Sequence, residues 1–151
     1  MVTVMNVFRV TLSGERIIEP MLALAGCAKQ QRIIVAGAKS LELMFELERR
    51  GYVHAAATAN CGRPARQYDA ALIDWRGRTV KALETTLVWL DGFLTAQGVI
   101  VVWVNHQKPA ELDVLRSALE RHGFVTEGKT VDQDGCALLA RRREAKPKAA
   151  A

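Results

Sequence analysis

The sequence predicts a three-layer α/β/α sandwich, built on a mostly parallel, doubly wound sheet with an antiparallel C-terminal hairpin. First, short β-branched apolar runs alternate with segments of helical periodicity, an order that favours parallel strands joined by right-handed crossovers. Second, the last two predicted strands, residues 124–131 and 136–141, are separated only by a short turn around Gly135. Such a connection is too short for a crossover and therefore joins antiparallel strands.

A helix is expected before the sheet begins. Residues 1–10 alternate loosely between apolar and polar and suit either an edge strand or a flexible lead-in. Ser13 can cap a helix over residues 15–25, although Pro20 must kink or divide it. This helix would pack against the sheet ahead of the first strand.

The first parallel unit consists of a short apolar run and the helix that follows it. Residues 32–36 (Arg-Ile-Ile-Val-Ala), bounded by Gly37, have the composition of a strand buried on both faces. Ser40 then caps a helix over residues 41–50, and a second strand is expected over residues 52–59. The predicted buried stripe of this helix consists of Leu41, Met44, Phe45 and Leu47.

Two further units complete the predicted sheet. Residues 68–75 are expected to form a strand with the acid Asp74 at its end, and a helix is expected to follow from Thr79. The strongest strand, residues 99–104, leads to Pro109, which suits the first position of a helix that ends at Gly123. The inner stripe of the helix from Thr79 is expected to contain Val80, Leu83, Leu87, Leu90 and Leu94.

Size and composition predict one soluble domain. The chain has 151 residues, of which 50% are hydrophobic and 25% charged. No apolar run approaches the roughly 20 residues that a membrane helix needs, and no secretory signal pattern is visible at the N-terminus. We therefore expect a cytoplasmic protein without a membrane partner, with a single domain over residues 1–143 and a disordered basic tail over residues 144–151.

Neither a metal site nor a nucleic-acid partner is expected. Cys27, Cys61 and Cys136 are widely separated and have no close Cys or His partners, so we interpret them as free, mostly buried thiols. The net charge of +5 is concentrated in residues 141–148, and the rest of the chain is close to neutral. A solvated tail explains this charge better than a nucleic-acid arm, whose contacts would be independent of sequence.

A small-molecule site is expected where the carboxyl ends of the parallel strands meet. In doubly wound sheets, ligands bind at this edge, where the winding reverses. Four segments should gather there: residues 36–38, 58–60, 74–75 and 105–106. His106 has no matching acid or serine nearby, and we interpret it as an exposed loop residue.

The order of elements, the strand over residues 68–75 and the closing hairpin resemble a class I S-adenosylmethionine-dependent methyltransferase. The resemblance covers residues 13–143. It implies a Rossmann-like fold with S-adenosylmethionine as cofactor and without a metal, and it places Asp74 toward the site of methyl transfer. The cofactor-binding residues that it implies are Gly37, Ala38, Asn60, Asp74 and Trp75.

Asp74 has a purely structural alternative. Its carboxylate could cap the turn that follows the strand, or pair with Arg76 or Arg78. Trp75 and Trp103 end two neighbouring strands, where core packing is the usual role of an aromatic side chain.

The chain departs from the pattern of the family at three places. After the first strand the family has an acid and a glycine-rich turn, whereas residues 35–40 (Val-Ala-Gly-Ala-Lys-Ser) contain one glycine and a lysine. After the second strand, Thr58 and Asn60 replace the acid that binds the ribose hydroxyls. Only about eight residues then remain before Tyr68, too few for another helix and strand, so one edge strand is expected to be missing.

A response-regulator receiver domain is a competing interpretation. Residues 32–35, the helix end at Gly51 and the strand before Asp74 resemble it, with Asp74 as the phosphorylated aspartate. The acidic pair of a receiver is replaced by Ala36 and Gly37, so its magnesium site would lack ligands. The closing hairpin also fits this fold badly.

Two functions stay open from the sequence. The first is a small, degenerate methyltransferase-like domain of unknown activity and substrate, with a retained ligand pocket. The alternative is a non-catalytic interaction or regulatory module, a pseudo-methyltransferase, whose exposed second strand is covered by a protein partner or by a second copy of the chain. Lys39, at a helix start, would favour an anionic small molecule over a sulfonium cation.

Overall fold

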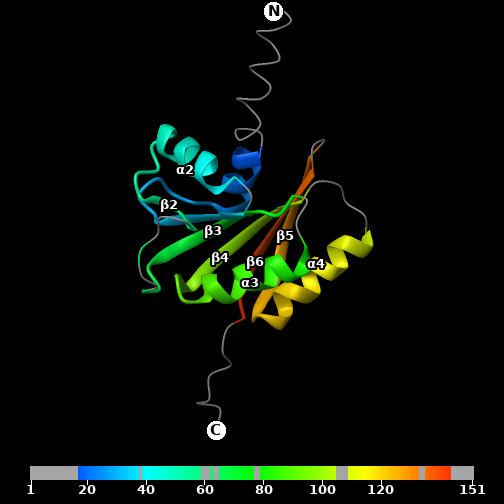
Figure 1. The fold of residues 1–151 in the computed structure, drawn as a ribbon. Coiled ribbons are helices and arrows are strands. Elements are labelled where there is room, and N and C mark those ends of the chain that lie inside the picture. Colours follow the sequence, from blue (N-terminus) through cyan, green and yellow to red (C-terminus); the bar gives the residue numbers. More distant parts are fainter. Residues whose placement is uncertain are drawn as a thin grey trace, which may run out of the picture.

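The computed structural model describes residues 17–37, 39–58, 62, 65–76, 79–104, 109–132 and 135–143. Within these residues, six strands form one sheet with helices on both faces (Figure 1). The strands are β1 (Ile33–Gly37), β2 (Ala55–Ala57), β3 (Tyr68–Asp74), β4 (Leu94–Val104), β5 (Phe124–Asp132) and β6 (Gly135–Arg142). The helices are α2 (Ser40–Arg49), α3 (Val80–Asp91), α4 (Pro109–Arg121) and a helix over residues 17–25.

The strand order is β2-β1-β3-β4-β6-β5. The first four strands of this order run parallel, whereas β6 is antiparallel to both β4 and β5. This arrangement confirms the predicted α/β/α sandwich with its antiparallel hairpin. The receiver interpretation is wrong, because the antiparallel strand β6 lies next to β4 in the sheet, where a receiver has a fifth parallel strand.

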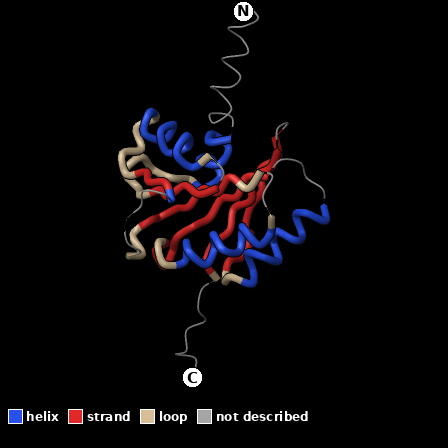
Figure 2. The backbone as a smooth tube through the Cα atoms, in the orientation of Figure 1, coloured by secondary structure: helices blue, strands red, loops and turns tan. Residues whose placement is uncertain are grey.

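Helices lie on both faces of the sheet (Figure 2). The sheet thus separates two hydrophobic cores. One core lies under α3 and α4 and contains the buried aromatic rings of Phe93 and Phe124. The other lies under α2 and the helix over residues 17–25, and it contains Trp103. Because β1, β3 and β4 are covered on both faces, their side chains are almost all buried, as expected for central parallel strands.

Predicted bounds are wrong for three elements, namely the helix after Thr79, β4 and the second strand. The helix after Thr79 ends at Asp91, and β4 begins at Leu94 instead of residue 99, because Leu94 pairs with Tyr68 across an irregularity in the β3 ladder. Leu94 fits the apolar spacing of the helix because it is also buried, although it belongs to β4. The second strand has only three residues, Ala55–Ala57, where eight were expected. Alanine contributes little side-chain packing to extend such a strand.

The predicted inner stripe of α2 is wrong at two of four positions. Met44 and Leu47 are buried as expected, together with Leu43. Leu41 and Phe45, in contrast, are 46% and 54% exposed. The helix thus carries two neighbouring apolar stripes, and the sheet covers only the one that faces β1 and β2.

The short second strand is an outer edge of the sheet, and no further strand of the described chain pairs with its free side. This agrees with the expected loss of an edge strand. The predicted N-terminal lead-in and the basic tail over residues 144–151 lie outside the described residues and stay predictions.

Candidate functional site

The carboxyl ends of β1, β3 and β4 meet at one edge of the sheet, as the parallel order requires. Gly37 lies in register with Asp74, and Asp74 with Trp103. Ala38, Asn60 and His106 lie outside the described residues, so their predicted places at this edge stay predictions. The described part of the site therefore consists of the last residues of these strands and the segments that follow β1 and β3.

Gly37 ends β1 in a conformation that disfavours other residues. Its φ angle is +105°, and a Cβ atom at this position would lie 2.1 Å from the Asp74 carbonyl oxygen. No side chain fits at that distance without moving β1 away from β3. The packing of the two strands thus requires this glycine, whether or not a ligand approaches the turn.

Asp74 is fully buried, and both of its carboxylate oxygens are occupied. The Arg76 guanidinium donates from Nε to Oδ1 at 2.8 Å and from its second terminal nitrogen to Oδ2 at 2.7 Å. The Arg76 backbone N–H also donates to Oδ1, at 3.2 Å. Both structural alternatives for Asp74 are therefore present together, the cap of the following turn and the pair with Arg76.

The electrostatics of this edge involve a residue that the sequence did not indicate. The hydrogen bonds that Arg76 donates to Asp74, and the negative charge of that carboxylate, raise the pKa of Arg76 above its ordinary value, against the opposing effect of burial, and the charge of Glu42 adds to the rise. Glu42 belongs to the first turn of α2, across the strand ends from Asp74. No sequence motif indicates that an acid in the first turn of a neighbouring helix will lie near Arg76, so only the fold identifies Glu42.

Lys39 occupies the N-cap position of α2, and its side chain is exposed. No side chain caps this helix start. The described part of this edge thus carries two cations, Lys39 and Arg76, and two acids, Glu42 and Asp74. A helix start with an adjacent ammonium group attracts anions rather than cations.

Trp75 and Trp103 lie on opposite faces of the sheet and line no common pocket. Trp75 is half-buried against the core under α3 and α4, and its indole N–H donates to the Thr79 carbonyl at 2.9 Å. Trp103 is fully buried in the other core. Trp75 therefore holds the segment that leads into α3, which is a structural role.

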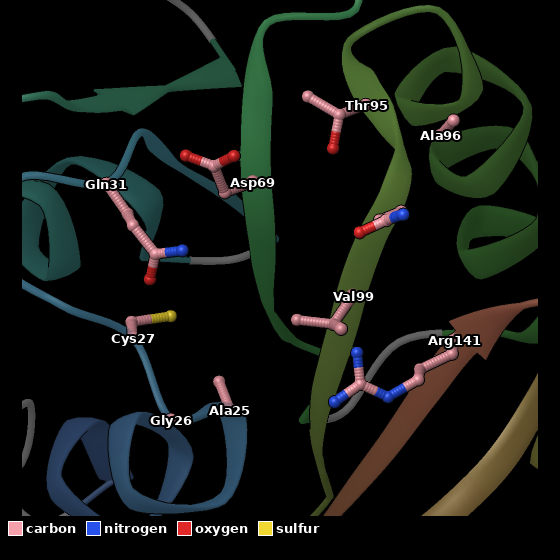
Figure 3. Close-up of a pocket in the computed structure, with 10 residues that line it drawn as sticks. Ala25, Gly26, Cys27, Gln31, Asp69, Thr95, Ala96, Val99 and Arg141 are labelled. Carbon is pink, nitrogen blue, oxygen red and sulfur yellow. The ribbon is translucent and has the colours of Figure 1, made fainter.

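A cavity of about 540 Å³ lies at the opposite edge of the sheet, near the amino ends of β1 and β3 (Figure 3). Its two charged lining residues, Asp69 and Arg141, have partners within the chain. The Asp69 carboxylate accepts from the Arg32 backbone N–H at 3.0 Å, and Arg141 donates to Glu127 at 2.5 Å. The cavity is lined by Ala25, Gly26, Cys27, Gln31, Asp69, Thr95, Ala96, Gln97, Val99 and Arg141.

The thiol in this cavity is not an activated nucleophile. Burial and the charge of Asp69 raise the pKa of Cys27 to about 11. A thiol with this pKa stays protonated at neutral pH, whereas catalytic thiols have lowered values. Sequence reasoning did not find this cavity because its lining comes from separate segments that share no motif.

The described residues contain no group of three or more His, Cys, Asp or Glu side chains that could hold a metal ion. The described part of the chain also has no helix that is long and apolar enough to cross a membrane.

No protein-family model and no curated protein sequence matches this chain. Solved structures do match. The 1,6-didemethyltoxoflavin-N1-methyltransferase of Burkholderia thailandensis, solved with S-adenosylhomocysteine, superposes with a TM-score of 0.59 at 12% identity, over 92% of this chain and 82% of its own. The release-factor-specific protein-(glutamine-N5) methyltransferase of Alicyclobacillus acidocaldarius gives 0.53 at 14% identity, over 86% and 91%. The magnesium protoporphyrin IX methyltransferase of Synechocystis gives 0.52 at 11% identity, over 87% and 82%.

These similarities show that the chain has the fold of the class I S-adenosylmethionine-dependent methyltransferases. They cover most of the length of each solved structure as well as of this chain. At such low identity the likeness establishes the fold and nothing about the chemistry.

Proposed function

We propose that this chain is a non-catalytic methyltransferase-like domain, a module that keeps the fold and acts by binding a partner. The observation that carries the proposal is the pair between Arg76 and Asp74. Asp74 is the acid that the resemblance directs toward the site of methyl transfer. In this chain both of its oxygens are used by a cation of the same chain.

The cost of opening this pair argues against a binding role for Asp74. The carboxylate is fully buried, so a ligand that displaced Arg76 would have to replace every hydrogen bond that Asp74 now accepts. Removing one partner of a buried ion pair typically costs about 3–5 kcal/mol. The described residues therefore do not fit the sulfonium end of S-adenosylmethionine.

The solved neighbours favour a second candidate, a domain that still binds the cofactor. The Burkholderia enzyme contains S-adenosylhomocysteine, and a putative tRNA methyltransferase of Streptococcus pneumoniae was solved with S-adenosylmethionine. In this chain the site would consist of the residues named from the resemblance. This candidate requires Arg76 to leave Asp74 when the cofactor binds.

Isothermal titration calorimetry and thermal-shift measurements on the full chain discriminate between the two candidates. We expect neither heat nor a shift with S-adenosylmethionine or S-adenosylhomocysteine at millimolar concentration. A structurally similar methyltransferase serves as the positive control. Submillimolar binding that is lost in Asp74→Asn would overturn the proposal and support the second candidate.

A further inference from the structure

We propose that a cavity between α4 and β5 binds a phosphate group, held by Arg116 and Lys129. The cavity has a volume of about 380 Å³ and lies where α4 packs on β5, the outermost strand at this end of the sheet (Figure 1). Its polar lining side chains are Arg116, Glu120, Thr126, Glu127 and Lys129. The cavity shares no residue with the carboxyl edge of the sheet, so anion binding here is independent of the proposed function.

An irregularity in β5 places Thr126 and Lys129 on the same face of the sheet. Thr126 lies in register with Ala140, and Lys129 lies in register with Leu138. Both of these partners on β6 belong to the core under α3 and α4. Residues three apart on a regular strand point to opposite faces, but the register of β5 shifts between Thr126 and Gly128. Because register partners share a face, Thr126 and Lys129 both point toward the side that α4 covers.

Arg116 approaches the same place from α4. Burial raises the pKa of the Cys136 thiol, and the positive charges of Lys129 and Arg116 both oppose this rise. The two cations thus act on one buried atom and line one cavity, Arg116 from the helix and Lys129 from the strand. This arrangement allows both of them to contact a single anion.

The chain itself leaves these polar groups unsatisfied. The Arg116 Nε–H and the Thr126 hydroxyl are buried, and neither has a hydrogen-bond partner among the described residues. Within the same residues, Arg116 forms no ion pair with Glu120, although the i,i+4 spacing on α4 permits one. Buried donors without an acceptor are rare in native structures and indicate a missing water or ion. An oxyanion in the cavity would supply the missing acceptor.

The acids that line the cavity do not neutralise its two cations. Glu127 is already paired with Arg141. Glu120 is exposed and is the remaining acid, so two cations stand against one unpaired acid in the described lining. Arginine binds phosphate through two N–H groups at once, and lysine binds it as a point charge. The net charge and the donor set therefore favour a dianionic phosphate.

The size of the cavity favours a small phosphate compound. Ligand pockets have volumes of roughly 300–1,000 Å³, and this cavity lies near the lower end of that range. The Arg116 Nε and the Thr126 hydroxyl have no exposed surface, so both side chains have to rotate toward the anion as it binds. Inorganic phosphate and a small phosphate ester share the required chemistry.

Phosphate titration of the full chain, followed by ¹H–¹⁵N NMR at constant ionic strength, tests the proposal. Inorganic phosphate should shift the backbone amide signals of residues 125–129 and the Nε–H signal of Arg116, with a dissociation constant of about 1 mM or lower. Chloride and acetate should leave these signals in place. Glycerol 3-phosphate distinguishes the two sources: tighter binding than inorganic phosphate identifies an ester as the ligand, and equal binding identifies free phosphate.

Single variants assign the binding to the two cations. Arg116→Gln and Lys129→Gln should each weaken phosphate binding at the amides of residues 125–129 about tenfold, because each removes one charged contact. Glu120→Gln should strengthen it. Arg121→Gln is the matched control, since it makes the same change on α4 at a side chain that is paired with Glu84. It should leave the affinity unchanged. Thermal melts confirm that each variant is folded.

Two results would overturn the proposal. One is the absence of shifts at residues 125–129 up to roughly 10 mM phosphate, where binding would be too weak to differ from screening by salt. The other is an affinity that survives both Arg116→Gln and Lys129→Gln. Lys39→Glu acts at the start of α2 and should not change the titration of these signals, so phosphate bound at the carboxyl edge is distinguished from phosphate in this cavity.

Discussion

Gly37 and Asp74 are register partners at the carboxyl ends of β1 and β3, and they approach so closely that a Cβ on Gly37 would lie 2.1 Å from the Asp74 carbonyl oxygen. The backbone of Asp74 thus fixes the turn after β1, while its side chain is held by Arg76. Asp74 therefore takes part both in the packing of β1 on β3 and in the charge pair of the candidate site. A change that disturbs the strand packing should also disturb the charge pair, and the reverse.

Gly37→Ala should lower the free energy of unfolding by more than about 2 kcal/mol, because a positive φ and a backbone contact act together. Gly26→Ala is the matched control. Its φ of +66° carries the conformational cost, but nothing lies within 4 Å of the added Cβ. We expect about 1–2 kcal/mol there. Urea denaturation of both variants measures the difference, and equal losses would contradict the importance of the contact with Asp74.

Arg76→Ala should destabilise the domain by about 3–5 kcal/mol, because it leaves the buried Asp74 carboxylate without its cation. The double variant Asp74→Leu with Arg76→Met removes both charges and should lose much less. Urea denaturation of the single and double variants gives the coupling between the two side chains. A loss below about 1 kcal/mol in Arg76→Ala would mean that the pair behaves like an exposed one.

Periodicity and turn residues predicted most of the fold, because both report local constraints. Pro109 begins α4 as expected, and the closing hairpin turns between Asp132 and Gly135. Leu41 and Phe45, in contrast, were predicted to be buried from the periodicity of α2, and both are exposed. Periodicity identifies an apolar stripe but does not reveal which neighbour covers it, and the sheet covers only one of the two stripes on α2.

The candidate site was less predictable than the fold. The sequence indicated Asp74 because it follows a buried strand, and its alternatives included the pair with Arg76 that the structure contains. The choice depended on burial and side-chain geometry, which one sequence does not provide. Glu42 and the cavity beside Cys27 depend on contacts between distant segments, and no local pattern marks them.

Cys27 should react slowly with alkylating reagents at neutral pH and faster as the pH approaches 11, because burial first, and then Asp69, raises the pKa of its thiol. Asp69→Asn should increase the rate at pH 9 by removing the smaller of these causes. The measurement is the pH profile of iodoacetamide alkylation in a Cys61→Ala and Cys136→Ala background. A midpoint near the ordinary value of 9 would contradict the assigned environment.

The same thiol makes folding stability depend on pH. Between about 9 and 11 the unfolded thiol has lost its proton while the folded one keeps it, so the folded state binds more protons. The corresponding stability is present below pH 9 and is lost as the pH rises through 11. Urea denaturation at pH 8 and pH 10.5 should show a larger decrease for the parent chain than for Cys27→Ala. Equal decreases would contradict the raised pKa.

Lys39→Glu should weaken anionic ligands selectively, if a small molecule binds at the carboxyl edge. The helix start of α2 has no side-chain cap, and Lys39, at the N-cap position, is exposed. Charge reversal should reduce affinity for inorganic phosphate and ATP about tenfold, as expected from one to two charge contacts at a helix start. Calorimetric titration with phosphate, ATP and S-adenosylmethionine measures this selectivity. Lys81→Glu, the same charge reversal at another exposed lysine, on α3, controls for net charge. Equal affinities of the parent chain and Lys39→Glu for every anion would show that Lys39 only faces solvent.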